Sequence, residues 1–139
     1  MGRTTETVIV QNLFDVNDFM LNKIKENQIR EVKIEAVVDT GATYLCLPPK
    51  VIKELGLIYS HSSKVRTASG NISLEFYQTA KIIINDRFTT MMVMQNLSDD
   101  VPALIGVLIL EALDYVVNSN SQKLIGNPEH GGEWMVEAF

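Results

Sequence analysis

A single aspartate interrupts an apolar stretch of the chain and limits what this region can fold into. The stretch reads EAVVDTGATYLCLP, residues 35–48, and it places Asp39 after an apolar run and before Thr40 and Gly41. Burying a lone carboxylate is costly, so such a group is paired, neutralised or used in chemistry. The residues from Ile34 to Val38 favour a strand, which would deliver Asp39 into a turn.

Length and composition favour one domain and exclude several kinds of partner. The 139 residues are 46% hydrophobic and 21% charged, so we expect one domain over 1–139, with a core at about 32–128. A net charge of −5 supplies no basic patch for nucleic acid. Cys46 is the one cysteine, and neither a leader nor a membrane-spanning run is recognisable. We therefore expect a cytoplasmic protein without nucleic-acid or membrane partners.

Short strands separated by turn residues dominate the rest of the chain. Residues 7–13 are rich in strand formers, and residues 17–34 favour two strands with a turn near KENQ, although a helix fits them too. Two long strands over residues 64–85 would meet at Ser69-Gly70-Asn71, and a further hairpin would turn at Asn85-Asp86. The N-terminal part, residues 1–31, is thus expected to contribute strands.

Two segments favour short helices. In LPPKVIKELGL, Pro49 suits the first turn and Gly56 suits the position just past the end. A second helix is expected from about Val107. The tail, residues 129–139, ends in EWMVEAF, which we interpret as a strand that could join a dimer sheet. The sequence predicts an all-β or mainly-β, barrel-like domain with one or two short helices.

Three interpretations of Asp-Thr-Gly compete. It could be an ordinary turn in which Asp and Gly serve the backbone. It could be a phosphate site of an actin-like ATPase, but the chain is too short and lacks the alternating βα pattern. It could also be half of an aspartic protease dyad, in which two carboxylates share a proton and activate a water.

The third interpretation demands a second chain. Asp39-Thr40-Gly41 occurs once, and no other aspartate is followed by Thr-Gly. A dyad could therefore form only across a two-fold axis, as a C2 homodimer with one Asp39 from each chain.

The sequence resembles the retropepsin-like aspartic proteases, and more closely their small bacterial and archaeal single-domain members. Three segments carry the resemblance: AVVDTGATYLCLPPKVIKELGL, VRTASGNISLEFYQTAKIIIND and PALIGVLILEALDYVVN. They correspond to the active-site turn with its helix, the flap hairpin, and the Leu-Ile-Gly segment before a helix. The resemblance implies an acid-protease barrel with one Asp-Thr-Gly lobe per chain, no cofactor or metal, and a peptide or protein substrate.

The resemblance also implies roles for individual residues. Asp39 would be the catalytic acid and base, Thr40 would link the two active-site turns across the dimer, and Gly41 would contact the substrate backbone. The residues expected to bind substrate are Ala42, Thr43, Leu104 and the flap tip Ala68, Ser69, Gly70 and Asn71.

Departures from the retroviral pattern leave alternatives open. Val107 and Thr43 stand where retroviral enzymes have an Arg and its pairing Asp, so both members of that ion pair are absent together. The main expectation is an aspartic endopeptidase, with a non-catalytic peptide-binding or scaffold dimer as the alternative. A latent enzyme covered by residues 1–30 or by the tail is a third possibility.

Overall fold

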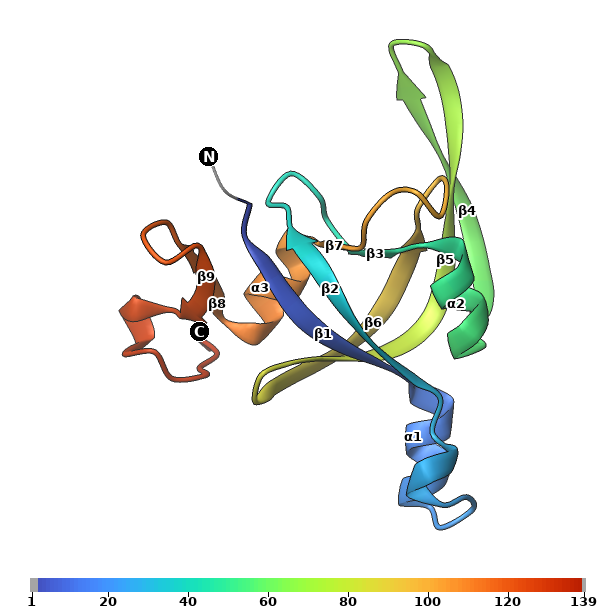
Figure 1. Ribbon diagram of the computed structural model, residues 1–139, viewed down its shortest axis with the longest axis horizontal. Helices are drawn as coiled ribbons and strands as arrows, with labels where there is room; N and C mark the ends of the chain where they lie inside the picture. Colours follow the sequence, from blue (N-terminus) through green and yellow to red (C-terminus); the bar gives the residue numbers. More distant parts are fainter. Residues whose placement is uncertain (1–2, 139) are drawn as a thin grey trace.

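Seven strands form one sheet that closes into a barrel in the computed structural model, which describes residues 3–138 (Figure 1). The strands are β1 (Thr5–Asn12), β2 (Glu31–Val38), β3 (Leu45–Leu47), β4 (Ile58–Thr67), β5 (Gly70–Ile84), β6 (Arg87–Gln95) and β7 (Leu104–Ile105). Their order is β1-β2-β7-β3-β6-β5-β4, and an additional β1–β5 pairing closes the barrel. This confirms the predicted mainly-β, barrel-like fold.

Alternating side chains of the strands build the core. Val8 and Val10 of β1, and Ile82 and Ile84 of β5, are fully buried, while the residues between them are partly exposed. This period of two places one face of each strand toward the barrel interior. Burying each such side chain contributes about 1.5–3 kcal/mol.

Three α-helices lie on or beside the barrel, where one or two were expected: α1 (Leu13–Met20), α2 (Pro49–Leu55) and α3 (Val107–Leu113). Two short 3₁₀ turns, η1 (Glu26–Gln28) and η2 (Pro128–His130), complete the helical elements. The predicted α2 is confirmed, with Pro49 in its first turn and Gly56 left-handed at φ 64°. The predicted start of α3 at Val107 is confirmed too.

The prediction of two strands over residues 17–34 is wrong, because α1 occupies the first part of this segment. Asn12 caps the helix by accepting a hydrogen bond from the Asp15 amide at 3.1 Å. Asp15 in turn binds Arg30 through both carboxylate oxygens, at 2.8 and 3.0 Å. These contacts fold residues 13–30 into a helical segment that lies outside the barrel sheet. The next strand, β2, begins at Glu31.

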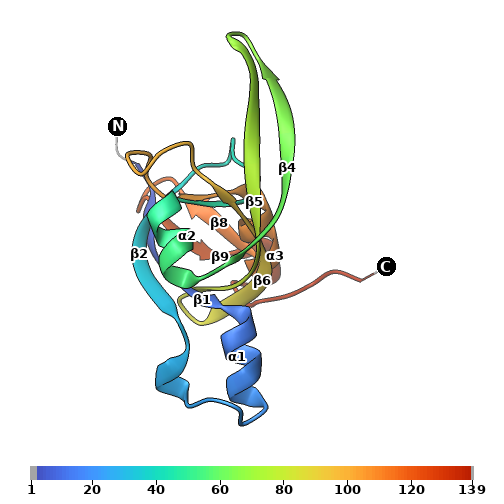
Figure 2. The same cartoon turned by 90° about the vertical axis from the view of Figure 1, so that its right-hand side faces the viewer.

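The two long hairpins are as predicted. β4 and β5 pair from Thr67↔Gly70 down to Ile58↔Gln78, and β5 and β6 turn at Asn85-Asp86. The outer half of the β4–β5 hairpin projects well beyond the barrel, as both ribbon views show (Figures 1 and 2).

The C-terminal region forms a hairpin of its own. Among residues 3–138, β8 (Tyr115–Asn118) and β9 (Lys123–Gly126) pair only with each other, as a separate two-stranded sheet. Residues 133–138 have no strand structure in the single chain, and Phe139 lies outside the described residues. The strand expected here would join a dimer sheet, so it stays a prediction.

Side-chain hydrogen bonds hold the tail against the rest of its own chain. Asp114 accepts from the Met135 amide at 3.2 Å and meets His130 at 2.6 Å. The buried Arg87 guanidinium donates to the Gly132 carbonyl at 2.6 Å and to the Leu113 carbonyl at 2.8 Å. We call residues 127–137 the tail strap.

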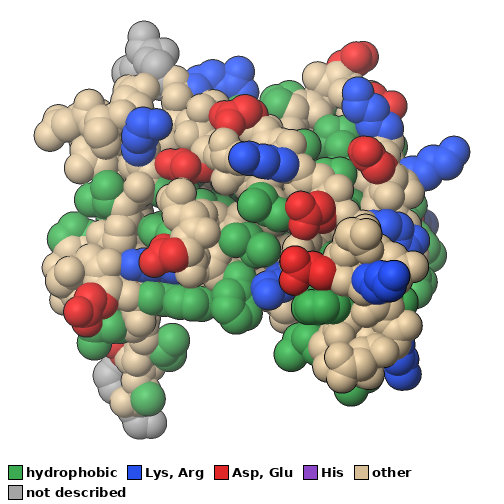
Figure 3. Space-filling model, turned by 60° about the horizontal axis from the view of Figure 1, so that its bottom comes forward, with side chains coloured by type: hydrophobic (Ala, Val, Ile, Leu, Met, Phe, Trp, Pro, Cys, Tyr) green, Lys and Arg blue, Asp and Glu red, His purple; other side chains and the backbone are tan. Residues whose placement is uncertain are grey.

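The surface seen from below carries cationic and anionic side chains interspersed among apolar ones (Figure 3). Among the helices described for residues 3–138, none has the length and hydropathy needed to cross a membrane.

Candidate active site

Asp39 lies at the end of β2, where a parallel neighbour fixes the backbone. Val37 pairs with Leu104 and Val38 with Ile105 on β7. The Asp39 amide continues this ladder by donating to the Ile105 carbonyl at 3.0 Å. Asp39 itself is half-buried, so its carboxyl group is reachable from solvent while its backbone belongs to the sheet.

Hydrogen bonds within the turn orient the Asp39 carboxylate. Oδ1 accepts from the Gly41 amide at 2.9 Å, and the Asp39 carbonyl accepts from the Ala42 amide at 3.0 Å. A Cβ at position 41 would lie 3.2 Å from Oδ1, so a larger residue would crowd the carboxylate. The Gly that follows Asp-Thr thus permits a close approach between backbone and carboxylate.

The start of α3 supports the turn from behind. The amides of Val107 and Leu108 donate to the carbonyls of Ala42 and Thr43 at 2.9 and 3.0 Å. A Cβ at Gly106 would lie 2.4 Å from the Tyr44 carbonyl oxygen, so the two segments touch through their backbones. The Asp-Thr-Gly and Leu-Ile-Gly segments, far apart in the sequence, therefore form one rigid unit.

The interior next to the turn is apolar. Burial raises the pKa of the Cys46 thiol to about 11, and the negative charge of Asp39 adds to the rise. Cys46 is 1% exposed, so this thiol is a buried, protonated neighbour of the site rather than a nucleophile.

Only some of the predicted site residues come together within one chain. Asp39, Thr40, Gly41, Ala42 and Thr43 form the turn, and Leu104 is close by on β7, paired with both Val37 and Cys46. Ala68, Ser69, Gly70 and Asn71 are exposed at the tip of the β4–β5 hairpin. Within residues 3–138, no hydrogen bond joins that tip to the turn.

One contact of the site was missed from the sequence. The Tyr44 ring packs edge-on against Phe76 of β5, with centroids 5.1 Å apart. No local pattern indicates this contact, because the two residues are far apart in the chain and meet only through the barrel.

A groove opens beside Thr40, on the face formed by α3 and the C-terminal hairpin. Its volume is about 400 Å³, and its lining is mostly apolar. The lining residues include Thr40, Val107, Leu110, Glu111, Tyr115 and Val117. Val117 is 38% exposed, so an apolar side chain of this hairpin stands open next to the active-site turn.

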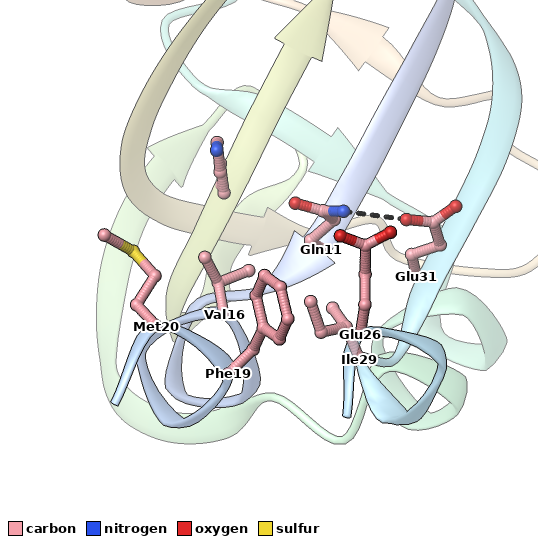
Figure 4. A pocket seen from close by; sticks show the side chains of 8 residues that line it. Gln11, Val16, Phe19, Met20, Glu26, Ile29 and Glu31 are labelled. Carbon is pink, nitrogen blue, oxygen red and sulfur yellow. Dashed lines mark hydrogen bonds between the residues drawn. The ribbon is translucent and has the colours of Figure 1, made fainter. Parts of the chain in front are cut away.

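A second hollow lies near α1 and shares no residue with the turn (Figure 4). Its volume is about 260 Å³, and its base is formed by Val16, Phe19 and Ile29. Gln11 donates to Glu31 across one wall at 2.7 Å. In Figure 1, α1 lies at the opposite end of the barrel from the turn, so this hollow is not part of the candidate site.

The chemistry that the turn can support follows from its side chains. Among residues 3–138, no group of three or more His, Cys, Asp and Glu side chains is placed to hold a metal ion. What the turn offers is one oriented carboxylate on a rigid backbone. Facing a second carboxylate, it could share a proton and activate a water molecule.

The family comparison agrees with this geometry. A family model described as gag-polyprotein putative aspartyl protease matches residues 26–112, which is more than half of the chain. The matched region contains the Asp39 turn, the β4–β5 hairpin and most of α3. No curated protein matches the chain.

Proposed function

The chain belongs to the gag-polyprotein putative aspartyl protease family, and from this membership we propose that it is an aspartic endopeptidase active as a C2 homodimer. One Asp39 from each chain would hold and activate a shared water. One carboxylate would act as base on that water while the other donates a proton to the carbonyl of the scissile peptide bond.

The observation that carries this proposal is the single, backbone-fixed Asp39 turn. Oδ1 of Asp39 is oriented by the Gly41 amide, and the turn is braced by Ile105 and by the start of α3. Such a site is preorganised, but it supplies only one of the two carboxylates that the reaction requires. A second copy of the chain is the simplest source of the other.

The groove beside Thr40 also favours a second copy of the chain as the partner. The β8–β9 hairpin packs on the barrel through the buried residues Tyr115 and Leu124, but Val117 of the same hairpin is 38% exposed. β8 and β9 pair only with each other, and Val117 and Leu110 line an apolar groove that reaches Thr40. A second copy that brought its own Asp39 to the turn would also cover this groove.

Substrate would lie in an extended conformation between the turn and the β4–β5 hairpin, which would act as the flap. An extended peptide can pair with exposed strand edges, which gives affinity without fixing the sequence. Thr40 would link the two turns, Gly41 would contact the substrate backbone, and Ala42, Thr43 and Leu104 would line the cleft. Residues 68–71 would close over the peptide.

The test is digestion of a peptide library by the full-length protein between about pH 3 and pH 8. Asp39→Asn should abolish cleavage, whereas Asp18→Asn, a carboxylate change on the remote helix α1, should leave it intact. Cleavage that survives in Asp39→Asn would contradict the proposed role. A folded dimer that cleaves nothing in this range would favour the non-catalytic peptide-binding or scaffold dimer instead.

A further inference from the structure

The β4–β5 hairpin leaves the barrel at a defined residue pair. Residues 70–75 of β5 pair only with β4, whereas Phe76 pairs both with His61 of β4 and with Met94 of β6. Phe76 is therefore the first residue of β5 that belongs to the closed sheet. Beyond this point the hairpin is a two-stranded ribbon, which twists and bends more easily than a sheet.

Irregular pairing flanks this exit point on both strands. The β4–β5 register shifts between Tyr59 and His61, and the β5–β6 register shifts between Tyr77 and Ala80. Such bulges bend a strand locally and increase its twist. The backbone is thus built to change direction next to the His61–Phe76 pair.

Three aromatic rings meet at the same place. The His61 imidazole is stacked on Phe76, with centroids 4.9 Å apart and planes only 8° from parallel. Tyr44 approaches Phe76 edge-on at 75°. Phe76 is 5% exposed, so this ring is enclosed between a hairpin residue and an active-site residue.

Tyr44 belongs to the rigid active-site unit. It ends the loop that begins at Asp39, and its backbone is in contact with Gly106. A displacement of the Tyr44 ring would therefore be transmitted to the same backbone that holds Asp39.

Two other side-chain contacts lie near this point, and neither involves the active-site loop. Ser62 donates to Glu75 at 2.6 Å, and Tyr59 packs edge-on against Tyr77. Ser62 and Glu75 both lie in the part of the hairpin beyond Phe76, so their bond stiffens the hairpin without fixing its angle to the barrel. Tyr77 pairs with Val93 of β6 and packs on the core, so Tyr59 meets a residue of the closed sheet rather than the active-site loop. The Tyr44–Phe76–His61 cluster is different, because it connects the hairpin to the active-site loop.

We propose that the Tyr44–Phe76–His61 cluster is the pivot that sets the position of the β4–β5 hairpin over the Asp39 turn. His61 and Tyr44 are positioning residues in this arrangement, since neither has to touch the reacting atoms. The hairpin tip and the 39–44 loop lie toward the same end of the barrel in both ribbon views (Figures 1 and 2), so a change of angle at Phe76 changes the opening between them. The catalytic consequence rests on the proposed peptidase function, but the pivot itself does not.

The decisive measurement is a distance distribution between two nitroxide labels, at Ser69→Cys on the hairpin tip and Lys53→Cys on α2, in a Cys46→Ala background. Labelled chains are mixed with excess unlabelled protein, so that a dimer carries labels on one chain only. His61→Ala and Tyr44→Leu should broaden the distribution and shift it. His61→Phe and Tyr44→Phe, which keep a flat ring, should restore it, and Lys64→Ala, farther out on the hairpin, should leave it unchanged. An unaltered distribution in both His61→Ala and Tyr44→Leu would overturn the pivot.

A kinetic measurement then tests the consequence for the site. Loss of one aromatic contact should raise KM by about two- to tenfold with a smaller change in kcat, because a loosely placed hairpin weakens substrate binding. His61→Phe should recover the original KM. Absence of peptidase activity in the unmodified protein would count against the proposed function, and the label distances would still decide the pivot.

Discussion

The Nδ1 atom of His130 lies 2.6 Å from Oδ2 of Asp114, and Nε2 of the same ring lies 2.9 Å from Glu137. His130 thereby bridges a carboxylate at the end of α3 and a carboxylate near the end of the chain. This bridge, with the Arg87–Gly132 bond, fastens the tail strap to the barrel.

We predict that the tail strap is held most firmly at mildly acidic pH. The hydrogen bonds to Glu137 and Asp114 raise the pKa of His130. The stabilisation that His130 gives to the folded tail strap is therefore complete below its ordinary pKa of 6.5 and is lost as pH rises through the raised pKa. The hydrogen bond with His130 is the main cause that lowers the pKa of Asp114. The stabilisation that Asp114 gives to the tail strap is therefore complete above its ordinary pKa of 3.8 and is lost as pH falls through the lowered pKa. The tail strap should therefore be most stable in the pH window between these two ordinary pKa values, 3.8 and 6.5.

Trp134 reports on this window because it is the one tryptophan of the chain. Its indole N–H donates to the Ala112 carbonyl at 3.1 Å, and its ring packs against Phe88. Release of the strap should shift Trp134 emission to the red at both ends of the window. In His130→Gln the alkaline transition should disappear, whereas Glu129→Gln should retain it; an unchanged alkaline transition in His130→Gln would contradict the assignment.

Gly106→Ala should destabilise the protein by about 3 kcal/mol or more, measured by chemical denaturation. Gly106 has an ordinary extended backbone, so the cost comes from the Cβ that would press on the Tyr44 and Thr43 backbones. Gly131→Ala is the comparison, because its Cβ meets open space and only its left-handed backbone, at φ 65°, opposes alanine. That change should cost about 1 kcal/mol. Equal losses of stability in the two variants would mean that the backbone contact between Gly106 and Tyr44 is not rigid.

Val117→Lys should weaken self-association at least about tenfold in sedimentation experiments, since it places a charge in the apolar groove beside Thr40. Val136→Lys is the matched control, because Val136 is 84% exposed on the tail strap and does not line that groove. Peptidase activity should fall with the dimer in the first variant only. A protein that sediments as a monomer at every concentration, before any substitution, would rule out the two-chain dyad.

Arg30→Gln should reduce stability by about 1 kcal/mol or less near neutral pH, because Arg30 is half exposed and solvent screens the pair. The pKa of Asp15 is lowered mainly by its side-chain hydrogen bond with Arg30. The stabilisation is therefore present above the ordinary Asp pKa and is lost as pH falls through the lowered one. The difference between the two proteins should shrink in acid; a difference that grows there would contradict this sign.

Elements with local signals were predictable from the sequence. Pro49 and Gly56 mark the two ends of α2, and Asn85-Asp86 marks a hairpin, because each signal acts on its own few residues. The Asp39 turn was recognisable for the same reason. The packing of Tyr44 on Phe76 was not, since it depends on the way the barrel brings distant segments together.

The error in secondary structure over residues 17–34 has a physical cause, and it differs from the situation of the tail. For α1, the partial alternation around Phe19 and Leu21 suggested strands, although Asn12 followed by Asp15 was a usable N-terminal helix signal. For residues 133–138, expected as a strand of a dimer sheet, the single chain shows only that the side chains of Asp114 and His130 hold the segment. Side-chain hydrogen bonds of this kind leave no periodic trace in the sequence.

The pairing of β2 with β7 also governs when the site can exist during synthesis. Asp39 is synthesised before its partners, because the carbonyl that accepts its amide belongs to Ile105 and the amides that brace its turn belong to Val107 and Leu108. A chain grows at about 5–20 residues per second, so several seconds separate the synthesis of these partners. The turn around Asp39 can therefore reach its final structure only after Val107 and Leu108 have been synthesised, when the strands β1 to β7 have already been made.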